Sequence, residues 1–206
     1  MTEPSWTVVV PVKRLRAAKS RLRGALPGVT HESLALALAL DTVSAALASP
    51  AVVEVLVVTD DIAAGRALRA LGARITPDPP TGGLNSAFTS GAALVGPVAV
   101  AALTADLPAL RSAELTAALA AAAAGPPRRR WFAPDAPGTG TVLLAAPAGV
   151  PLDPRFGGAS AAAHAASGAL ALTGAGPTLR RDVDTRADLL VAAALGLGRH
   201  TAALLP

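Results

Sequence analysis

Short apolar runs alternate with longer segments of mixed polarity along most of the chain. A strand that is buried on both faces reads as a nearly continuous apolar run. Three runs are of this kind: Thr7–Val12, Val52–Thr59 and Val98–Thr104. Shorter runs predict four further strands: Ala73–Thr76, Trp131–Ala133, Thr141–Ala146 and Ala169–Leu172.

The segments between these strands predict helices. The clearest is His31–Leu47, because Thr30 before it is a residue type that caps a helix by accepting a backbone N–H. The other predicted helices are Ile62–Leu71 (ended by Gly72), Ser86–Leu94, Ser112–Ala124 (capped by Ser112), Ser160–Ser167 and Ala187–Leu195. This alternation, without an internal repeat or a long linker, predicts one α/β domain spanning residues 1–206. Its central sheet is mostly parallel, with helices on both faces.

In such a sheet, ligands bind beyond the carboxyl ends of the strands, so the residues that follow each strand are the first candidates for function. The first strand is followed by a basic loop. Lys13, Lys19 and Arg21 in this loop can hold the oxygens of a triphosphate and stabilise a departing pyrophosphate, and we predict them as catalytic residues. The alternative is a solvated basic loop.

A glycine-rich turn precedes the helix predicted at Ser86. Gly82 and Gly83 let the backbone approach a nucleotide closely, and the amide of Asn85 offers a donor and an acceptor to a purine edge. Alternatively, this is an ordinary turn in which Asn85 or Ser86 caps the helix. Asp60-Asp61, after the second long strand, also has two interpretations. One of these residues could face a ribose or base, or one could cap the next helix.

Two segments carry candidate metal ligands. Asp106 follows a buried strand, where a carboxylate is costly unless it is paired or bound to a metal, and it is not needed as a helix cap. Near the C-terminus, Thr185 and Asp188 resemble a capping box, which leaves Asp182 or Asp184 to join Asp106 on a metal. Two carboxylates that share the ion with substrate phosphates are typical of Mg²⁺.

Two further glycine-rich loops predict a site for a small anion. Gly138-Thr139-Gly140-Thr141 precedes a strand, and Arg155-Phe156-Gly157-Gly158-Ala159-Ser160 leads into a helix. Backbone amides in such loops bind carboxylates and phosphates. The alternative for each is a tight turn.

Composition narrows the function classes. The chain has no Cys, which excludes disulfides, thiolate metal sites and thiol nucleophiles, and its three histidines show no ligand spacing. Aromatic residues make up only 2%, and we expect no nucleic-acid partner despite a net charge of +4. The apolar runs are too short to span a bilayer, and the N-terminal residues lack signal-peptide features, so we expect no membrane partner and a cytoplasmic location.

Six motifs together resemble the CofC/FbiD family of 2-phospho-L-lactate and phosphoenolpyruvate guanylyltransferases, which act in biosynthesis of coenzyme F(420). The resemblance runs nearly end to end. Its motifs are Val12-Lys13-Arg14-Leu15, Ala18-Lys19-Ser20-Arg21-Leu22, Ala105-Asp106-Leu107-Pro108, Gly138-Thr139-Gly140-Thr141, Pro154-Arg155-Phe156-Gly157 with Ser160, and Asp182-Val183-Asp184-Thr185. Gly158 and Arg186 stand where the family usually has Pro.

The resemblance implies a nucleotidyltransferase fold of the nucleotide-diphospho-sugar transferase-like, GT-A type. It implies that Asp106 and Asp182 hold Mg²⁺, and that Thr141, Gly157 and Ser160 contact the three-carbon acid. GTP and phosphoenolpyruvate or 2-phospho-L-lactate are then the expected substrates, and the downstream transferase of the pathway is an expected partner.

Two other functions remain open on the sequence alone. One is a molybdopterin or sugar-phosphate nucleotidyltransferase, although such enzymes usually have a glycine-rich loop after the first strand, where this chain has no glycine before Gly24. The other is a non-catalytic nucleotide-binding regulator. Retention of both Asp106 and Asp182 favours an enzyme.

Overall fold

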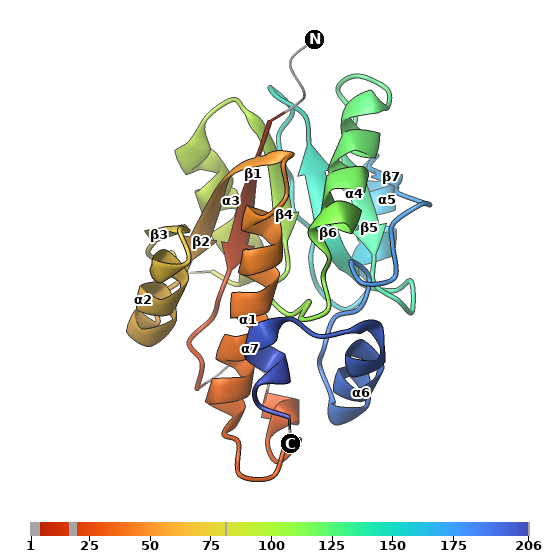
Figure 1. Ribbon diagram of the computed structural model, residues 1–206. Coiled ribbons are helices and arrows are strands. Elements are labelled where there is room, and N and C mark those ends of the chain that lie inside the picture. Colours follow the sequence, from red (N-terminus) through yellow and green to blue (C-terminus); the bar gives the residue numbers. More distant parts are fainter. Residues whose placement is uncertain (1–4, 17–19, 81, 206) are drawn as a thin grey trace.

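The computed structural model describes residues 5–16, 20–80 and 82–205, which are arranged around a seven-stranded sheet of order β3-β2-β1-β4-β6-β5-β7 (Figure 1). β1, β2, β3 and β4 are mutually parallel, whereas β6 runs antiparallel to both β4 and β5. The strands are β1 (Trp6–Pro11), β2 (Val52–Val58), β3 (Arg74–Thr76), β4 (Ala99–Leu103), β5 (Trp131–Pro134), β6 (Thr141–Ala146) and β7 (Leu170–Ala171).

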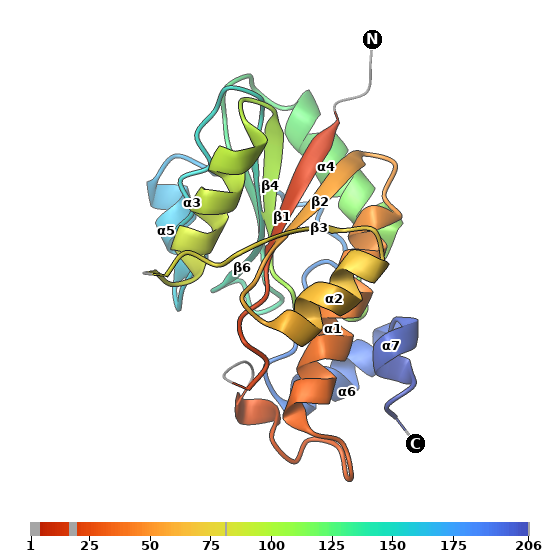
Figure 2. The same cartoon turned by 90° about the vertical axis from the view of Figure 1, so that its left-hand side faces the viewer.

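Helices cover both faces of the sheet (Figure 2). One face packs against α1 (His31–Leu47), α2 (Ile62–Ala70) and α4 (Ser112–Ala124), and the other against α3 (Leu84–Val95) and α5 (Ser160–Ala166). β1 is buried throughout because its side chains alternate between these two cores. Val8 and Val10 belong to the core under α1, and Val9 packs with Phe88 of α3.

Smaller elements lie beyond the carboxyl ends of the parallel strands: η1 (Ser20–Leu22), α6 (Arg186–Leu195) and α7 (Arg199–Ala202). Leu22, Leu38 and Leu189 join η1, α1 and α6 in a third apolar cluster. α7 is fixed by Asp41 of α1, which is only 5% exposed and accepts the backbone N–H groups of His200 (2.9 Å) and Thr201 (2.8 Å).

We expect Asp41→Ala to lower the free energy of unfolding by about 3 kcal/mol, because it removes two hydrogen bonds to a buried carboxylate and leaves their donors unsatisfied. Urea denaturation would measure the change. Glu54→Ala, at a half-exposed position on β2, is the control and should change stability by about 0.5 kcal/mol or less. Equal effects of the two substitutions would contradict a stabilising role for Asp41.

The predicted α/β architecture and its strands and helices are confirmed, but the cap predicted at Ser112 is wrong, and so is the alternative that Asn85 or Ser86 caps a helix. α3 begins at Leu84, so Asn85 and Ser86 already lie inside the helix and Gly83 is its N-cap residue. α4 has Arg111 at its N-cap, and the Arg111 N–H is bound by the Thr178 hydroxyl from a distant loop. Neither η1 nor α7 was predicted from the sequence. No helix in the described part of the chain is long and apolar enough to cross a membrane.

Candidate functional site

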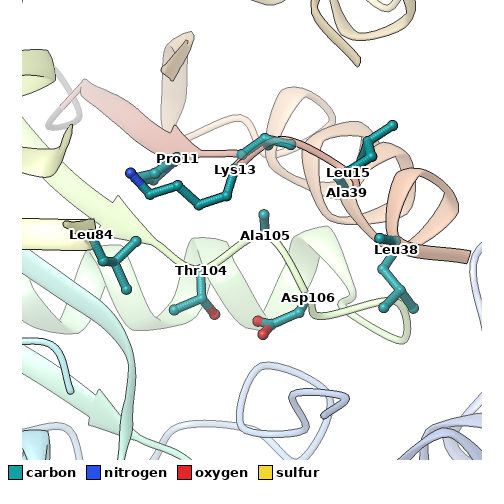
Figure 3. A pocket seen from close by; sticks show the side chains of 11 residues that line it. Pro11, Lys13, Leu15, Leu38, Ala39, Leu84, Thr104, Ala105 and Asp106 are labelled. Carbon is teal, nitrogen blue, oxygen red and sulfur yellow. The ribbon is translucent and has the colours of Figure 1, made fainter. Parts of the chain in front are cut away.

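A pocket opens at the carboxyl ends of β1 and β4, where the sequence predicts ligand binding (Figure 3). One side is formed by the loop after β1 and by α1, and the other by the loop after β4 and by Leu84 at the start of α3. The lining residues are Pro11, Val12, Lys13, Leu15, Ala35, Leu38, Ala39, Leu84, Thr104, Ala105 and Asp106. The pocket therefore combines an apolar wall with one ammonium and one carboxylate.

Lys13 enters this pocket from the loop after β1 and is held by Asp78. Its Nζ lies 2.6 Å from Asp78 Oδ2, and in Figure 3 its side chain extends away from Asp106. Asp78 is positioned in turn, since its N–H donates to Asp60 Oδ1 at 3.1 Å. An ammonium has three N–H donors, so Lys13 can keep this ion pair and still donate to a phosphate.

Asp61 fixes the same loop. Its carboxylate accepts the N–H groups of Ala64, which caps α2, and of Leu15, each at 3.0 Å. Burial acts to raise the pKa of Asp61, but these hydrogen bonds outweigh it and lower the pKa below its ordinary value. The capping interpretation is confirmed for Asp61, which also shapes the pocket through Leu15.

The two predicted metal-binding segments lie side by side. The N–H of Val183 donates to the backbone carbonyl of Asp106 at 3.0 Å, which brings Asp182 next to the loop after β4. In the described residues no group of three or more His, Cys, Asp or Glu side chains is placed to hold a metal. A pair of carboxylates fits Mg²⁺, which takes its remaining ligands from water and substrate phosphates.

Thr104 is a pocket residue that the sequence analysis missed. Its hydroxyl oxygen is buried and has no hydrogen-bond partner in the described part of the protein, and Figure 3 shows it on the same side of the loop as the Asp106 carboxylate. The signal in the sequence was a threonine at the carboxyl end of a buried strand, one position before the motif that drew attention.

None of the other residues predicted to bind phosphate or nucleotide is among the described residues that line the pocket. Lys19 lies outside the described residues. Arg21 is exposed in η1 and is not among the described residues that line the pocket. Gly82 has φ +144°, and a Cβ there would collide with the side chain of Ser86, so this turn requires glycine. Gly83 is the N-cap residue of α3.

Asn85 connects this turn to the second glycine-rich loop. Its amide faces the backbone of Phe156: Nδ2 donates to the carbonyl at 3.0 Å, and Oδ1 accepts the N–H at 2.7 Å. The structure thus gives Asn85 a structural task that sequence reasoning did not foresee, and its contact with a base stays a prediction.

The three residues expected to contact the acid come from neighbouring segments. Thr141 is buried at the start of β6. This end of the strand adjoins the pocket, since the N–H of Thr104, a pocket residue, donates to the carbonyl of Val142 at 3.0 Å. Ser160 is buried at the start of α5, and its N–H donates to the carbonyl of Gly157 at 3.2 Å. Ser160 is not the N-cap residue, since that position is taken by Ala159 with no side-chain hydrogen bond.

His164 of α5 joins two of these segments, although the sequence analysis gave it no role. It is fully buried, and its Nδ1 lies 2.9 Å from the Thr141 hydroxyl while its Nε2 lies 2.9 Å from the backbone N of Arg155. Burial is the main cause that lowers the pKa of His164 from 6.5 to about 4, and the positive charge of Arg130 adds to it. The imidazole is therefore neutral at neutral pH.

Comparison with solved structures finds the same fold in other proteins. The chain superposes on 4-diphosphocytidyl-2C-methyl-D-erythritol synthase from Anaerococcus prevotii with a TM-score of 0.62, covering 93% of this chain and 96% of the other at 11% identity. It superposes on CMP:2-keto-3-deoxy-manno-octonic acid synthetase with a TM-score of 0.59, covering 93% and 98% at 16% identity. The predicted fold type is confirmed.

Sequence comparison gives the family. Residues 6–164 match the family model described as "Guanylyl transferase CofC like". A protein of Salinispora arenicola named phosphoenolpyruvate guanylyltransferase is 69% identical over 97% of this chain and 92% of its own length. A protein of Streptomyces coelicolor with the same name is 54% identical over 97% and 95%. Because the family model covers most of the chain and these relatives match it over nearly their whole length, the chain belongs to the CofC-like guanylyl transferase family.

Proposed function

We propose that this protein transfers GMP from GTP to the phosphate of phosphoenolpyruvate and releases pyrophosphate. The observation that carries the proposal is the hydrogen bond between Val183 and Asp106, because it brings two carboxylate segments to the pocket that Lys13 lines. The names of the curated relatives support phosphoenolpyruvate as the acceptor.

The chemistry needs charge neutralisation and alignment rather than a general base. An oxygen of the acceptor phosphate attacks the α-phosphorus of GTP, and the bond from that phosphorus to the pyrophosphate oxygen breaks. The attacking oxygen is already anionic, so no proton has to be removed. Lys13 binds phosphate oxygens with the N–H groups that Asp78 leaves available, and Lys19 and Arg21 are proposed to assist on the departing pyrophosphate.

Asp106 and Asp182 are proposed to hold Mg²⁺, which would supply the positive charge that neutralises the triphosphate and makes its α-phosphorus more electrophilic. Gly82 and Gly83 let the turn before α3 approach the nucleotide, with Asn85 at the start of that helix.

Thr141, Gly157 and Ser160 are proposed to bind the three-carbon acid. They come from loops that hydrogen bonds hold together, including the one from Ala161 N–H to the carbonyl of Thr139 at 3.1 Å, and the Asn85 amide ties the 155–157 loop to the start of α3. The acid carries a phosphate and a carboxylate. Because the metal and Lys13 act on phosphates, these loops are the best placed to hold the carboxylate.

We expect Ser160→Ala and Gly157→Ala each to raise the KM for phosphoenolpyruvate about tenfold, with little change in the KM for GTP. The serine substitution removes a hydroxyl at the acid site, and the alanine is strained because Gly157 has φ +152°. Steady-state kinetics with each substrate varied separately would measure both constants.

Gly158→Ala is the matched control, since a Cβ at Gly158 meets no atom within 4 Å and its φ lies outside the left-handed region. It should leave both constants unchanged. An unchanged KM for phosphoenolpyruvate in both test variants would remove these residues from the acid site.

Release of pyrophosphate from GTP, Mg²⁺ and phosphoenolpyruvate tests the function itself. The same assay with 2-phospho-L-lactate decides between the two acceptors. Absence of release with either acid, from protein that still binds GTP, would contradict the proposal. GTP and phosphoenolpyruvate are cytoplasmic metabolites, so the proposal includes a cytoplasmic location, with coenzyme F(420) biosynthesis as the pathway and the downstream transferase as the recipient of the product.

A further inference from the structure

We infer that His164 is a positioning residue that turns the Thr141 hydroxyl into a fixed hydrogen-bond donor toward the acid substrate. The inference rests on the proposed function, because it assigns the direction of a contact within the acid site. It concerns a side chain that is not among the described residues lining the pocket and that acts through its hydrogen bonds to Thr141 and Arg155.

The hydrogen-bond partners determine which ring nitrogen carries the proton. The backbone N–H of Arg155 can only donate, so Nε2 of His164, 2.9 Å away, must accept. In the neutral ring the proton then sits on Nδ1, which points at the Thr141 hydroxyl at 2.9 Å. The Thr141 oxygen therefore accepts from His164.

This arrangement fixes what Thr141 can offer to a ligand. A hydroxyl has one hydrogen and two lone pairs, and one lone pair is occupied by the Nδ1–H of His164. With that bond in place, the hydroxyl hydrogen is available to donate, which suits an anionic oxygen of the acid. With the opposite tautomer the hydroxyl would donate to His164 instead, and only lone pairs would face the ligand.

The surroundings of His164 keep it in this state. Its ring contacts Phe156 edge-on, with centroids 5.1 Å apart, and lies 5.9 Å from Phe132. Arg130 and Arg155 also act to lower the pKa of the ring, while Asp153 and a hydrogen bond with the Ser160 backbone act to raise it. The ring is neutral, enclosed and hydrogen-bonded at both nitrogens, which fixes its orientation toward Thr141.

The second hydrogen bond of His164, to Arg155, connects it to the loop that the Asn85 amide binds. Arg155 precedes Phe156, whose N–H and carbonyl are both bound by the Asn85 amide. One path of hydrogen bonds thus runs from the start of α3 through the 155–157 loop to His164 and Thr141. His164 holds this loop and the start of β6 in register at the acid site.

Histidine NMR tests the tautomer in the unmodified protein. In protein labelled with ¹⁵N-histidine, we expect one residue to show protonated Nδ1 and unprotonated Nε2 at pH 7. Substitution of His164 by Asn or Gln should remove this signal. A spectrum in which the His164 ring is protonated at Nε2, or at both nitrogens, would overturn the inference.

Two substitutions then separate the roles of the two nitrogens. The amide nitrogen of Asn can take the place of Nδ1 and donate to Thr141, whereas the longer Gln reaches only toward Arg155. We expect His164→Gln to raise the KM for phosphoenolpyruvate roughly 10- to 100-fold with the KM for GTP within about twofold. His164→Asn should recover part of this loss. His200→Gln is the control and should change neither constant.

A double-mutant cycle shows whether His164 acts through Thr141. Thr141→Val removes the hydroxyl, so the further effect of His164→Gln on the KM for phosphoenolpyruvate should nearly vanish in the Val background. The inference would be overturned if the two substitutions raised the KM for phosphoenolpyruvate independently, so that their fold-changes multiplied. It would also be overturned if His164→Gln raised the KM values for phosphoenolpyruvate and GTP equally, since His164 would then be a structural residue. Because the unmodified enzyme must turn over phosphoenolpyruvate for the cycle to be run, failure of the proposed function would show separately, as absence of activity before any substitution.

Discussion

Asp106→Asn is expected to lower the rate of pyrophosphate release at least about 10³-fold while leaving the melting temperature almost unchanged. The amide has nearly the shape of the carboxylate but lacks the charge that would hold Mg²⁺ against the triphosphate, and a loss of several kcal/mol in transition-state stabilisation corresponds to this factor. The hydrogen bond that joins this loop to Val183 uses the backbone carbonyl, so the substitution leaves it intact.

Asp182→Asn should have a similar effect, and the double variant should be little worse than either single one, because residues that act on one ion are not additive. Glu54→Gln, which changes a carboxylate on β2 that pairs with Arg74, is the control and should retain full activity. A folded Asp106→Asn protein with near-normal turnover would remove Asp106 from the metal site. Asp184→Asn tests whether the neighbouring carboxylate also takes part.

GTP is expected to exceed ATP in kcat/KM by about 10³-fold or more. A site that hydrogen-bonds a substrate leaves buried polar groups unpaired when the wrong base binds, and this can reject an analogue by up to about 10⁴–10⁵. No aromatic side chain is among the described residues that line the pocket, so we expect discrimination between bases to come from hydrogen bonds rather than from stacking. Competition between the two nucleotides in the pyrophosphate assay would measure the ratio.

Inosine triphosphate, which lacks the 2-amino group of guanine, shows which edge of the base is recognised. Asn85→Ala then separates two roles for that residue. If the amide contacts guanine, the preference for GTP falls; if it only holds Phe156, the preference remains and the KM for phosphoenolpyruvate rises. Equal rates with GTP and ATP in the unmodified enzyme would contradict the guanylyl assignment.

The fold was predictable from the sequence because the buried strands are short apolar runs separated by longer segments of mixed polarity, several of which carry a cap residue or a glycine at their ends. Asp106 could also be singled out, since few structural roles suit an aspartate at the end of a buried strand. The capping box left both Asp182 and Asp184 open, the resemblance to the family favoured Asp182, and metal binding by these residues stays a prediction. Prediction failed where one local pattern fits two structures. Gly83-Leu84-Asn85-Ser86 contains three residues that could cap a helix. The helix begins at Leu84, and Asn85, inside it, hydrogen-bonds instead to Phe156, far along the chain.

His164 shows a different limit. Histidines that bind metals or act in catalysis are found by their spacing to other chemical groups, and His164 has no such spacing. Its partners are a hydroxyl 23 positions earlier and a backbone N–H nine positions earlier. A backbone N–H has no signature in the sequence, so only the folded chain reveals that this histidine is held at both nitrogens.

The reversal of β6 divides the ligand edge into two parts that differ in origin. Parallel strands contribute their ends to this edge, whereas β6 contributes its beginning, together with the 135–140 hairpin that joins it to β5. This hairpin is held from outside the sheet, since Arg180 donates to the carbonyls of Pro134 and Asp135, and Ala161 N–H donates to the carbonyl of Thr139. The proposed acid site is thus positioned by a turn and its neighbouring loops, whereas the ends of β1, β2 and β4 are positioned by the crossover helices between parallel strands.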